Sequence, residues 1–275
     1  MNVVCFGAHP DDAEVFAGGT CIKWARQGHR VLLVSLTNGD IGHFAMAGGV
    51  LARRRAEEAR ASAERAGFEH RVLDNHDGEL QPTLELRREI VRIIRRHRAD
   101  LVLTHRPWDY HPDHRYASQA VQDAAFMVTV PYFCPDVPRL EQNPVFAYLM
   151  DRFTKPAPFT PDVAVDIGDA VEAKWDLLDA MPSQFYEWLP WLEGKHETVP
   201  TEPERRRLWL RESCAPHFEA MTAAARDALT RWYGADRAAQ VQYAECFEFC
   251  EYGRQPSEEE VRRLFPFFPQ GGDRP

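Results

Sequence analysis

Two short segments of this 275-residue sequence concentrate imidazole and carboxylate side chains. The first segment has one histidine and three acids: His9, Asp11, Asp12 and Glu14. The second has three histidines and two acids: His105, Asp109, His111, Asp113 and His114. Imidazole nitrogens and carboxylate oxygens are zinc ligands, and a catalytic zinc keeps one coordination position for water. Two imidazoles and one carboxylate would complete such a site and leave the other groups for proton transfer.

The spacing within each segment supports this interpretation. His9 and Asp12 are three residues apart, as are His111 and His114, so one helical turn places each pair on one face. Each segment alone is also explained as a polar turn in which an aspartate caps the next helix. Their joint occurrence behind two strands of one sheet favours a catalytic site over that explanation.

The elements that must position these segments alternate between strand and helix over about the first 130 residues. We predict strands at 3–7, 31–36, 70–73 and 101–104, and helices at 14–27, 51–66, 84–97 and 114–127. This alternation is typical of parallel βαβ units, whose ligands bind beyond the carboxyl ends of the strands. Both polar segments directly follow a predicted strand, so we expect them to converge at one sheet edge.

The second half of the chain is less regular. We predict strands at 145–150, 163–167 and 240–252, helices at 168–181 and 204–232 with a break at Pro216, and a long loop at 187–203. The expected architecture is one α/β, Rossmann-like domain over 1–275, with a mostly parallel sheet covered by helices on both faces. Residues 1–130 would form its βαβ core, 131–255 would be an elaboration that shapes the substrate cleft, and 270–275 would be a disordered tail.

Composition limits the partners and the compartment. The net charge of −9 disfavours binding to nucleic acid. No apolar run approaches the ~18 residues of a membrane helix, and the N-terminus lacks the features of a signal peptide. Six cysteines without a CxxC pair favour free thiols. We therefore expect a cytoplasmic protein without nucleic-acid or membrane partners, while a homo-oligomer stays open. Three further histidines are expected at the surface: His29, His70 and His97.

The two polar segments resemble the signature motifs of the PIG-L (LmbE-like) family of zinc-dependent N-deacetylases. Ala-His-Pro-Asp-Asp stands at 8–12 and is followed by Gly-Gly-Thr at 18–20, and His-Pro-Asp-His stands at 111–114. Further similarity lies at 37–40, 55–58, 183–184 and 243–253. The pair of motifs at this separation is specific, whereas either motif alone would be weak. The resemblance covers most of the chain and is strongest over about the first 130 residues.

The resemblance implies a role for each matched residue. His9, Asp12 and His114 would ligate one zinc ion per chain, although ligand type leaves other divalent metals open. Asp11 would be the general base that deprotonates the metal-activated water. His111 would stabilise the oxyanion as an imidazolium and protonate the leaving amine.

The resemblance also implies that residues around these positions orient the catalytic side chains or bind the substrate. Asp113 would orient a ligating or catalytic imidazole. Arg55 matches an arginine that contacts sugar hydroxyls, and a solvated arginine in the run 53–55 is an equal alternative. Ala13 and Phe16 depart from the residues common in the family, Glu and Gly, and Phe16 could pack against the sheet or narrow the cleft. The glycine-rich loop 41–50 could act as a lid.

The function implied is that of a metal-dependent N-deacetylase. It would be a hydrolase acting on linear amide bonds, which removes an acetyl group from N-acetylglucosamine or another small N-acetylated amino sugar or glycoconjugate. An amidase that cuts a larger acyl group or a thiol conjugate is an alternative with the same site. A metallo-phosphoesterase is less favoured because it needs two metals and more bridging carboxylates. A non-catalytic sugar-binding module would need neither Asp11 nor His111.

Overall fold

A seven-stranded sheet forms the centre of the computed structural model, which describes residues 1–269. Its strands are β1 (Asn2–Gly7), β2 (Arg30–Ser35), β3 (Glu69–Val72), β4 (Leu101–Thr104), β5 (Val145–Leu149), β6 (Val163–Asp166) and β7 (Ala244–Gly253). Across the sheet the order is β3-β2-β1-β4-β5-β7-β6. The first five strands of this order, β3-β2-β1-β4-β5, pair in parallel. Strand β7 is antiparallel to both β5 and β6.

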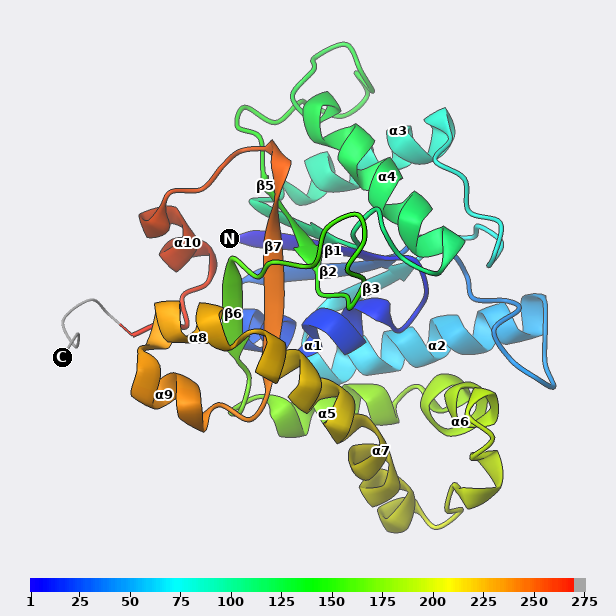
Figure 1. The fold of residues 1–275 in the computed structure, drawn as a ribbon. Coiled ribbons are helices and arrows are strands. Elements are labelled where there is room, and N and C mark those ends of the chain that lie inside the picture. The colour runs from blue at the N-terminus through cyan, green and yellow to red at the C-terminus, as the bar shows by residue number, and fades with distance from the viewer. Residues whose placement is uncertain (270–275) are drawn as a thin grey trace.

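Both faces of the sheet are buried because the strands are apolar at successive positions. In β1, Val3 and Cys5 belong to one core and Val4 and Phe6 belong to another on the opposite face. The helices of the first half are α1 (Asp12–Arg26), α2 (Gly49–Ala66), α3 (Leu84–His97) and α4 (Pro112–Met127). Figure 1 shows α3 and α4 on one side of the sheet and α1 and α2 on the other. This three-layer arrangement follows from strands that must be covered on both faces.

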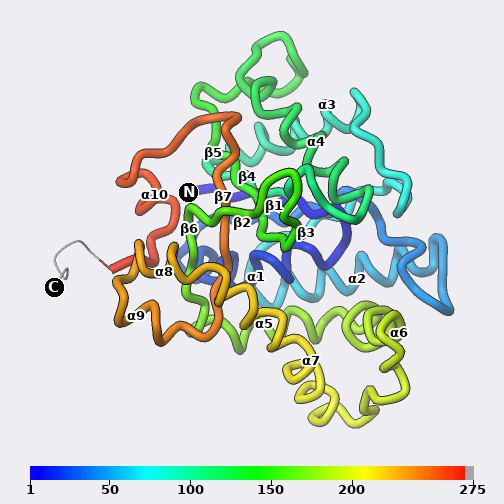
Figure 2. Tube along the Cα trace, viewed as in Figure 1, coloured from blue at the N-terminus to red at the C-terminus, as the bar shows by residue number. Residues whose placement is uncertain are grey.

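The second half adds helices that extend the layer containing α1 and α2. They are α5 (Val171–Asp179), the π-helix η1 (Ser183–Trp188), α6 (Leu189–Leu192), the 3₁₀-helix η2 (His196–Thr198), α7 (Pro203–Ala224), α8 (Arg226–Tyr233), α9 (Ala235–Gln240) and α10 (Glu258–Leu264). Trp175, Phe218 and Leu229 from three of these helices pack in a third core with Ala164 and Cys246 of the sheet. Figure 2 traces this packing of α5 and α7 beneath the sheet.

The structure confirms the predicted fold class, a mostly parallel α/β sheet with helices on both faces. Two predicted elements are wrong. The loop expected at 187–203 contains the end of η1, α6 and η2. The helix expected to break at Pro216 continues through it and ends at Ala224. Pro216 is exposed, so the carbonyl that loses its helical hydrogen bond can face water instead. The predicted disordered tail lies outside the described residues.

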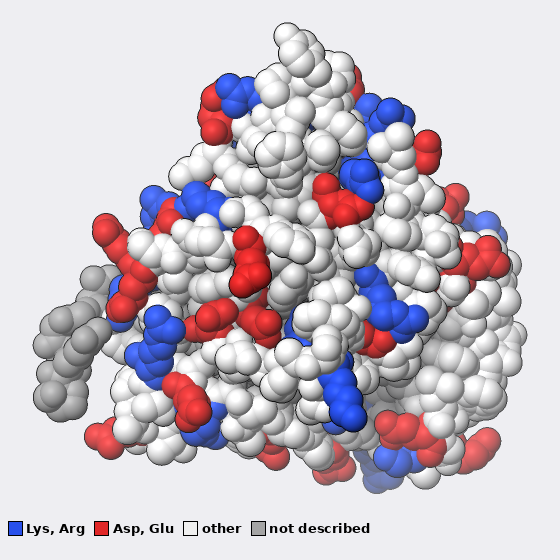
Figure 3. Space-filling model, turned by 45° about the horizontal axis from the view of Figure 1, so that its top comes forward, with Lys and Arg blue, Asp and Glu red and all other residues white. Residues whose placement is uncertain are grey.

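The surface carries no concentration of one charge on the face shown in Figure 3, where acidic and basic side chains are interspersed. Within residues 1–269, none of the helices combines the length and the apolar character that crossing a bilayer requires.

Candidate active site

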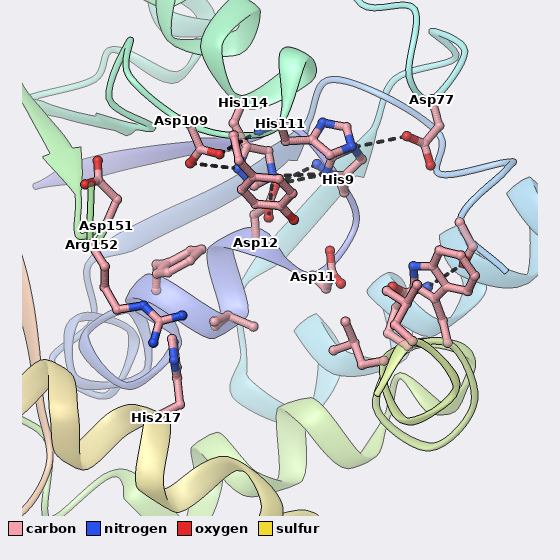
Figure 4. Close-up of a pocket in the computed structure, with 18 of the residues that line it drawn as sticks. His9, Asp11, Asp12, Asp77, Asp109, His111, His114, Asp151, Arg152 and His217 are labelled. Atoms are coloured by element: carbon pink, nitrogen blue, oxygen red, sulfur yellow. Dashed lines mark hydrogen bonds and ion pairs between the residues drawn. The ribbon is translucent and has the colours of Figure 1, made fainter. Parts of the chain in front are cut away.

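The two polar segments meet at the carboxyl edge of β1 and β4. These strands are parallel neighbours, with Val3 paired to Leu101 and Cys5 to Leu103. The turn after β1 therefore lies beside the turn after β4, although about 100 residues separate them in sequence. The ring centroids of His9 and His111 are 4.5 Å apart, and Figure 4 shows both rings beside His114.

The three predicted ligands bring four metal-ligating atoms close together, one from each imidazole and both oxygens of Asp12. His9 Nδ1 lies 3.6 Å from Asp12 Oδ2 and 3.3 Å from His114 Nε2. His114 Nε2 lies 3.4 Å from Asp12 Oδ1. Bonds of ~2.0–2.2 Å to a tetrahedral zinc would separate ligand atoms by about 3.3–3.6 Å. The side chains as placed therefore fit one small divalent cation.

Other combinations of side chains at this edge also bring metal-ligating atoms together. Three overlapping groups have ligand atoms within 4.8 Å of one another: His9–His111–His114, Asp12–His105–His114 and His9–Asp77–Asp113. His105 is buried and stacks on His114 with ring centroids 4.1 Å apart. Its Nε2 lies 3.1 Å from the Ala8 N–H nitrogen and also 3.1 Å from Asp12 Oδ2, so protein groups already occupy it. His105 therefore packs against the predicted ligands and is not itself expected to bind the metal.

Carboxylates determine which nitrogen of each imidazole faces the centre. His9 Nε2 lies 3.1 Å from Asp77 Oδ1 and 3.3 Å from Asp113 Oδ2. His114 Nδ1 lies 3.1 Å from Asp109 Oδ2. Such carboxylate contacts fix ring orientation and raise ligand basicity. Asp113 is where the resemblance expects an orienting acid, whereas the same contact by Asp77 and Asp109 was not predicted. Their positions in the sequence could have indicated this role, because Asp109 stands inside the second polar segment and Asp77 follows β3 at the same sheet edge.

The surrounding charges favour a cation at this place. Burial lowers the pKa of His9, but hydrogen bonds that it donates to the carboxylates of Asp113, Asp12 and Asp77 raise it well above its usual value. The pKa of His114 rises to about 9, because Asp12 and Asp109 outweigh the effect of burial. Burial would raise the pKa of Asp12, yet His114 and His105 hold it well below its usual value. A divalent metal would replace protons in this acid-rich site.

Asp11 is free to act on substrate because it does not cap α1. It occupies the N-cap position but makes no side-chain capping hydrogen bond. Its carboxylate lines the pocket, 3.3 Å from the Arg55 Nη2. Burial raises the pKa of Asp11, and the positive charge of Arg55 opposes that rise. A carboxylate with a raised pKa is a better proton acceptor than an ordinary one.

His111 faces the same pocket as a neutral donor. It caps α4 by accepting the Asp113 N–H on Nδ1 at 3.2 Å, which assigns the proton of the neutral ring to Nε2. Burial lowers its pKa, and the charges of His9 and His114 lower it further. The resting ring is therefore neutral, whereas the resemblance implies an imidazolium.

Arg55 is buried, so the alternative of a solvated arginine is wrong. Its Nη1 bonds the Gly39 carbonyl at 3.4 Å, and a Cβ at Gly39 would lie 2.4 Å from that nitrogen. Gly39 also has a φ of +67°, a region that favours glycine. Only glycine at position 39 therefore leaves room for Arg55 beside Asp11.

The pocket around these groups has a volume of about 860 Å³. Phe16 lines it, packs on both cores of its layer, and brings its ring within 6.3 Å of the His105 ring, so it both packs and narrows the cleft. The other wall comes from the second half of the chain, through residues that include Arg152, Trp188, Leu192 and His217. Arg152, Leu192 and His217 were not predicted to line the site.

This sheet edge, with its imidazoles, carboxylates and adjoining cleft, has the architecture of a metal-dependent hydrolase. The family model for GlcNAc-PI de-N-acetylase (PIG-L) matches residues 4–125. A diacetylchitobiose deacetylase from Thermococcus kodakarensis is 35% identical over 206 residues, which cover 70% of this chain and 74% of that protein. The chain belongs to the PIG-L family, which confirms the resemblance, and its predicted class as a deacetylase agrees with the names of its relatives.

More distant matches agree in fold. A probable N-acetyl-alpha-D-glucosaminyl L-malate deacetylase 2 from Bacillus anthracis is 27% identical over 225 residues, covering 76% of this chain and 94% of that one. The crystal structure of the N,N'-diacetylchitobiose deacetylase from Pyrococcus horikoshii has a TM-score of 0.67 and 24% identity, covering 90% of this chain and 83% of the other. The crystal structure of a 4-carboxy-2-hydroxymuconate hydratase from Pseudomonas putida has a TM-score of 0.71 and 20% identity, covering 94% of this chain and 99% of the other. The fold alone therefore does not decide the reaction.

Proposed function

We propose that this protein is a zinc-dependent deacetylase that removes the acetyl group from a small N-acetylated amino sugar or glycoconjugate. The observation that carries the proposal is the cluster of metal-ligating atoms from His9, Asp12 and His114 beside the carboxylate of Asp11, which does not cap its helix. Relatives named as deacetylases of N-acetylated sugars support the substrate class. The 860 Å³ pocket is large for an acetyl group and one sugar, which also favours an amidase with a larger acyl group as the second candidate.

His9 Nδ1, the Asp12 carboxylate and His114 Nε2 would hold the metal. When bound there, zinc supplies Lewis acidity, which lowers the pKa of a water and polarises an amide carbonyl. Asp77 and Asp113 keep His9 Nδ1 turned toward the centre, and Asp109 does the same for His114 Nε2. These contacts organise the donor atoms before substrate arrives.

The chain's own groups would move the protons of the hydrolysis. Asp11 accepts the proton of the attacking water on its carboxylate, while Arg55 keeps that carboxylate ionised and in place. The Nε2–H of His111 donates to the carbonyl oxygen as negative charge develops there. The proton held by Asp11 then passes to the leaving nitrogen, so that acetate and a free amine are released.

Metal content and acetate release test the proposal together. We expect one divalent metal per chain by elemental analysis and acetate release from N-acetylglucosamine or N,N'-diacetylchitobiose. Chelation should abolish release, and zinc should restore it more effectively than other divalent ions. Phosphate release from phosphate esters without acetate release would instead indicate a phosphoesterase. Metal binding with no turnover of any N-acyl sugar or N-acyl conjugate would contradict the proposal.

The remaining sequence-based expectations are kept as proposals. We propose that residues 1–275 act as one domain in which 131–255 shape the cleft, which the lining residues from β5 to α7 support. A cytoplasmic location and the absence of nucleic-acid partners stay predictions, and the oligomeric state stays open.

A further inference from the structure

Almost all of the charged side chains that line the pocket contact an imidazole or a group of opposite charge in the protein. At the candidate metal centre, the acids contact imidazoles or Arg55, as described above. On the opposite wall, Asp151 lies 3.1 Å from the Arg106 Nε. Glu193 bonds the Lys195 ammonium at 2.7 Å. The lining carboxylates are therefore already neutralised by the protein.

Arg152 is the exception among the pocket's cations. It follows β5 and lines the pocket, yet its guanidinium has no hydrogen bond or ion pair with any of residues 1–269. The acid beside it in sequence, Asp151, is turned away to Arg106. Figure 4 shows the Arg152 side chain directed into the pocket, toward His217. A guanidinium so placed offers its donors to whatever occupies the pocket.

His217 adds a second group with unused hydrogen-bonding capacity. It lies on α7, lines the pocket and is half-buried, and no side-chain hydrogen bond to it is found in the described part of the chain. Burial lowers its pKa, and the charges of Arg152 and Lys174 lower it further. Both cations are thus close enough to His217 to affect its charge. Because Lys174 is bonded to Glu245, the unneutralised charge belongs to Arg152.

The two groups stand apart from Arg55 and the metal cluster. Arg55 belongs to α2 and is bonded to Asp11, whereas Arg152 and His217 come from the β5 end and α7. Figure 4 shows Asp11 and the Arg152–His217 pair well apart among the residues that line the pocket. With its amide at the metal cluster, a substrate would have room in the 860 Å³ pocket for a substituent that reaches this pair.

We propose that Arg152 and His217 form a subsite for an anionic group, a carboxylate or a phosphate, carried by the substrate beyond its N-acetylated sugar. The subsite rests on the proposed deacetylase function and narrows its substrate to acidic glycosides. Arg152 would bind two anion oxygens side by side, and His217 would donate one further hydrogen bond.

Kinetics with matched glycosides test the subsite. Acetate release is measured with methyl N-acetylglucosaminide, its carboxymethyl counterpart and N-acetylglucosamine 1-phosphate, which separate neutral, carboxylate and phosphate substrates. We expect kcat/KM to favour at least one anionic substrate by about tenfold or more. Arg152→Gln should lose most of that preference. Lys155→Gln, which removes an exposed cation from the same loop but not from the pocket, should keep it.

Binding without turnover separates this inference from the proposed function. The zinc-loaded Asp11→Asn variant is titrated with the same three glycosides by calorimetry, alone and combined with His217→Gln. Tighter binding of an anionic glycoside, weakened by His217→Gln, supports the subsite even if no acetate is ever released. Equal affinities and equal kcat/KM for neutral and anionic glycosides would overturn the subsite and leave the deacetylase proposal standing.

Discussion

Asp11 differs from the other acids at the sheet edge in its contacts. Asp12, Asp77, Asp109 and Asp113 each contact an imidazole, whereas the carboxylate of Asp11 contacts only Arg55 among the described residues. An acid that neither caps its helix nor orients a histidine has no evident structural use at this position. Burying this carboxylate costs free energy, and chemistry on a bound substrate best explains why Asp11 stands here.

Replacing this carboxylate separates catalysis from metal binding. Asp11→Asn keeps the shape and removes the proton acceptor, so we expect kcat to fall by about 10²–10⁴-fold while zinc content is unchanged. Acetate release and elemental analysis on the same preparation measure both. Asp136→Asn, an exposed acid paired with Arg92, is the matched control. Full turnover by Asp11→Asn, or loss of its zinc, would refute the assignment.

Asp77 has the more indirect role of holding a ring. Asp77→Asn removes one of two carboxylates from His9 Nε2, so the zinc dissociation constant should rise by about 10–100-fold. Competition with a chelator of known affinity measures this change. Excess zinc should then restore most of the lost activity. If zinc affinity stays at the wild-type value while KM rises, Asp77 contacts substrate instead.

Residue types predicted the cluster but not the burial of single side chains. The motifs at 8–12 and 111–114 place imidazoles and acids behind two strands, and parallel pairing brings them together. His70, however, was expected at the surface, and its side chain is fully buried. It bonds Glu14 at 2.8 Å and Ser35 at 2.8 Å, because Glu14 is buried on α1 and needs a partner. Such a pairing depends on tertiary contacts that local sequence does not encode.

At the scale of elements, α1 is the helix on which the site depends most. Its first turn carries Asp12, and the N–H groups of Gly19 and Thr20 in its middle donate to Glu245 at 2.8 and 2.6 Å. Lys174 bonds Glu245 at 2.7 Å and the Val15 carbonyl at 2.6 Å. The buried ion pair thus ties α1 to β7 and to α5. Part of the family resemblance, at 18–20, therefore has a structural basis in this anchor.

Removing one partner of this pair should be costly. Lys174→Met leaves the Glu245 charge buried without its cation, and we expect a loss of about 3–5 kcal/mol in the free energy of unfolding. The double variant Lys174→Met with Glu245→Gln removes both charges and should lose less than the single variant. Urea unfolding of the zinc-loaded proteins measures both values. A double variant that is less stable than Lys174→Met would show that the charges themselves stabilise the fold.

Elements with strong periodicity could be predicted, and those without it could not. The helix expected at 84–97 is observed with the same bounds, since Thr83 caps it and one apolar face recurs every turn. The π-helix at 183–188 has six residues and α6 has four, so neither is long enough for an apolar face to recur over several turns. Trp188 stacks on Trp191, and Trp191 stacks on Phe44 of the loop at 41–50. The suggested lid is thus attached to α6 by aromatic contacts.

For the whole molecule, the metal would act as a cross-link. Its proposed ligands come from the turn after β1, the start of α1 and α4, and the acids that orient them come from the segments after β3 and β4. Elements from both halves of the parallel sheet therefore converge on one ion. In its absence, protons held by His9 and His114 balance part of the negative charge of these acids.

This convergence predicts that zinc stabilises the entire fold. A ligand that binds only the folded state, at 100 times its dissociation constant, adds about 2.7 kcal/mol. For a chain of this size that corresponds to a rise in Tm of roughly 5–10 °C. Calorimetry of metal-free and zinc-loaded protein measures the shift, with His114→Ala, which should bind little zinc, as the control. Equal Tm values for the two forms, with one zinc bound per chain, would place the metal on a surface site rather than between β1 and β4.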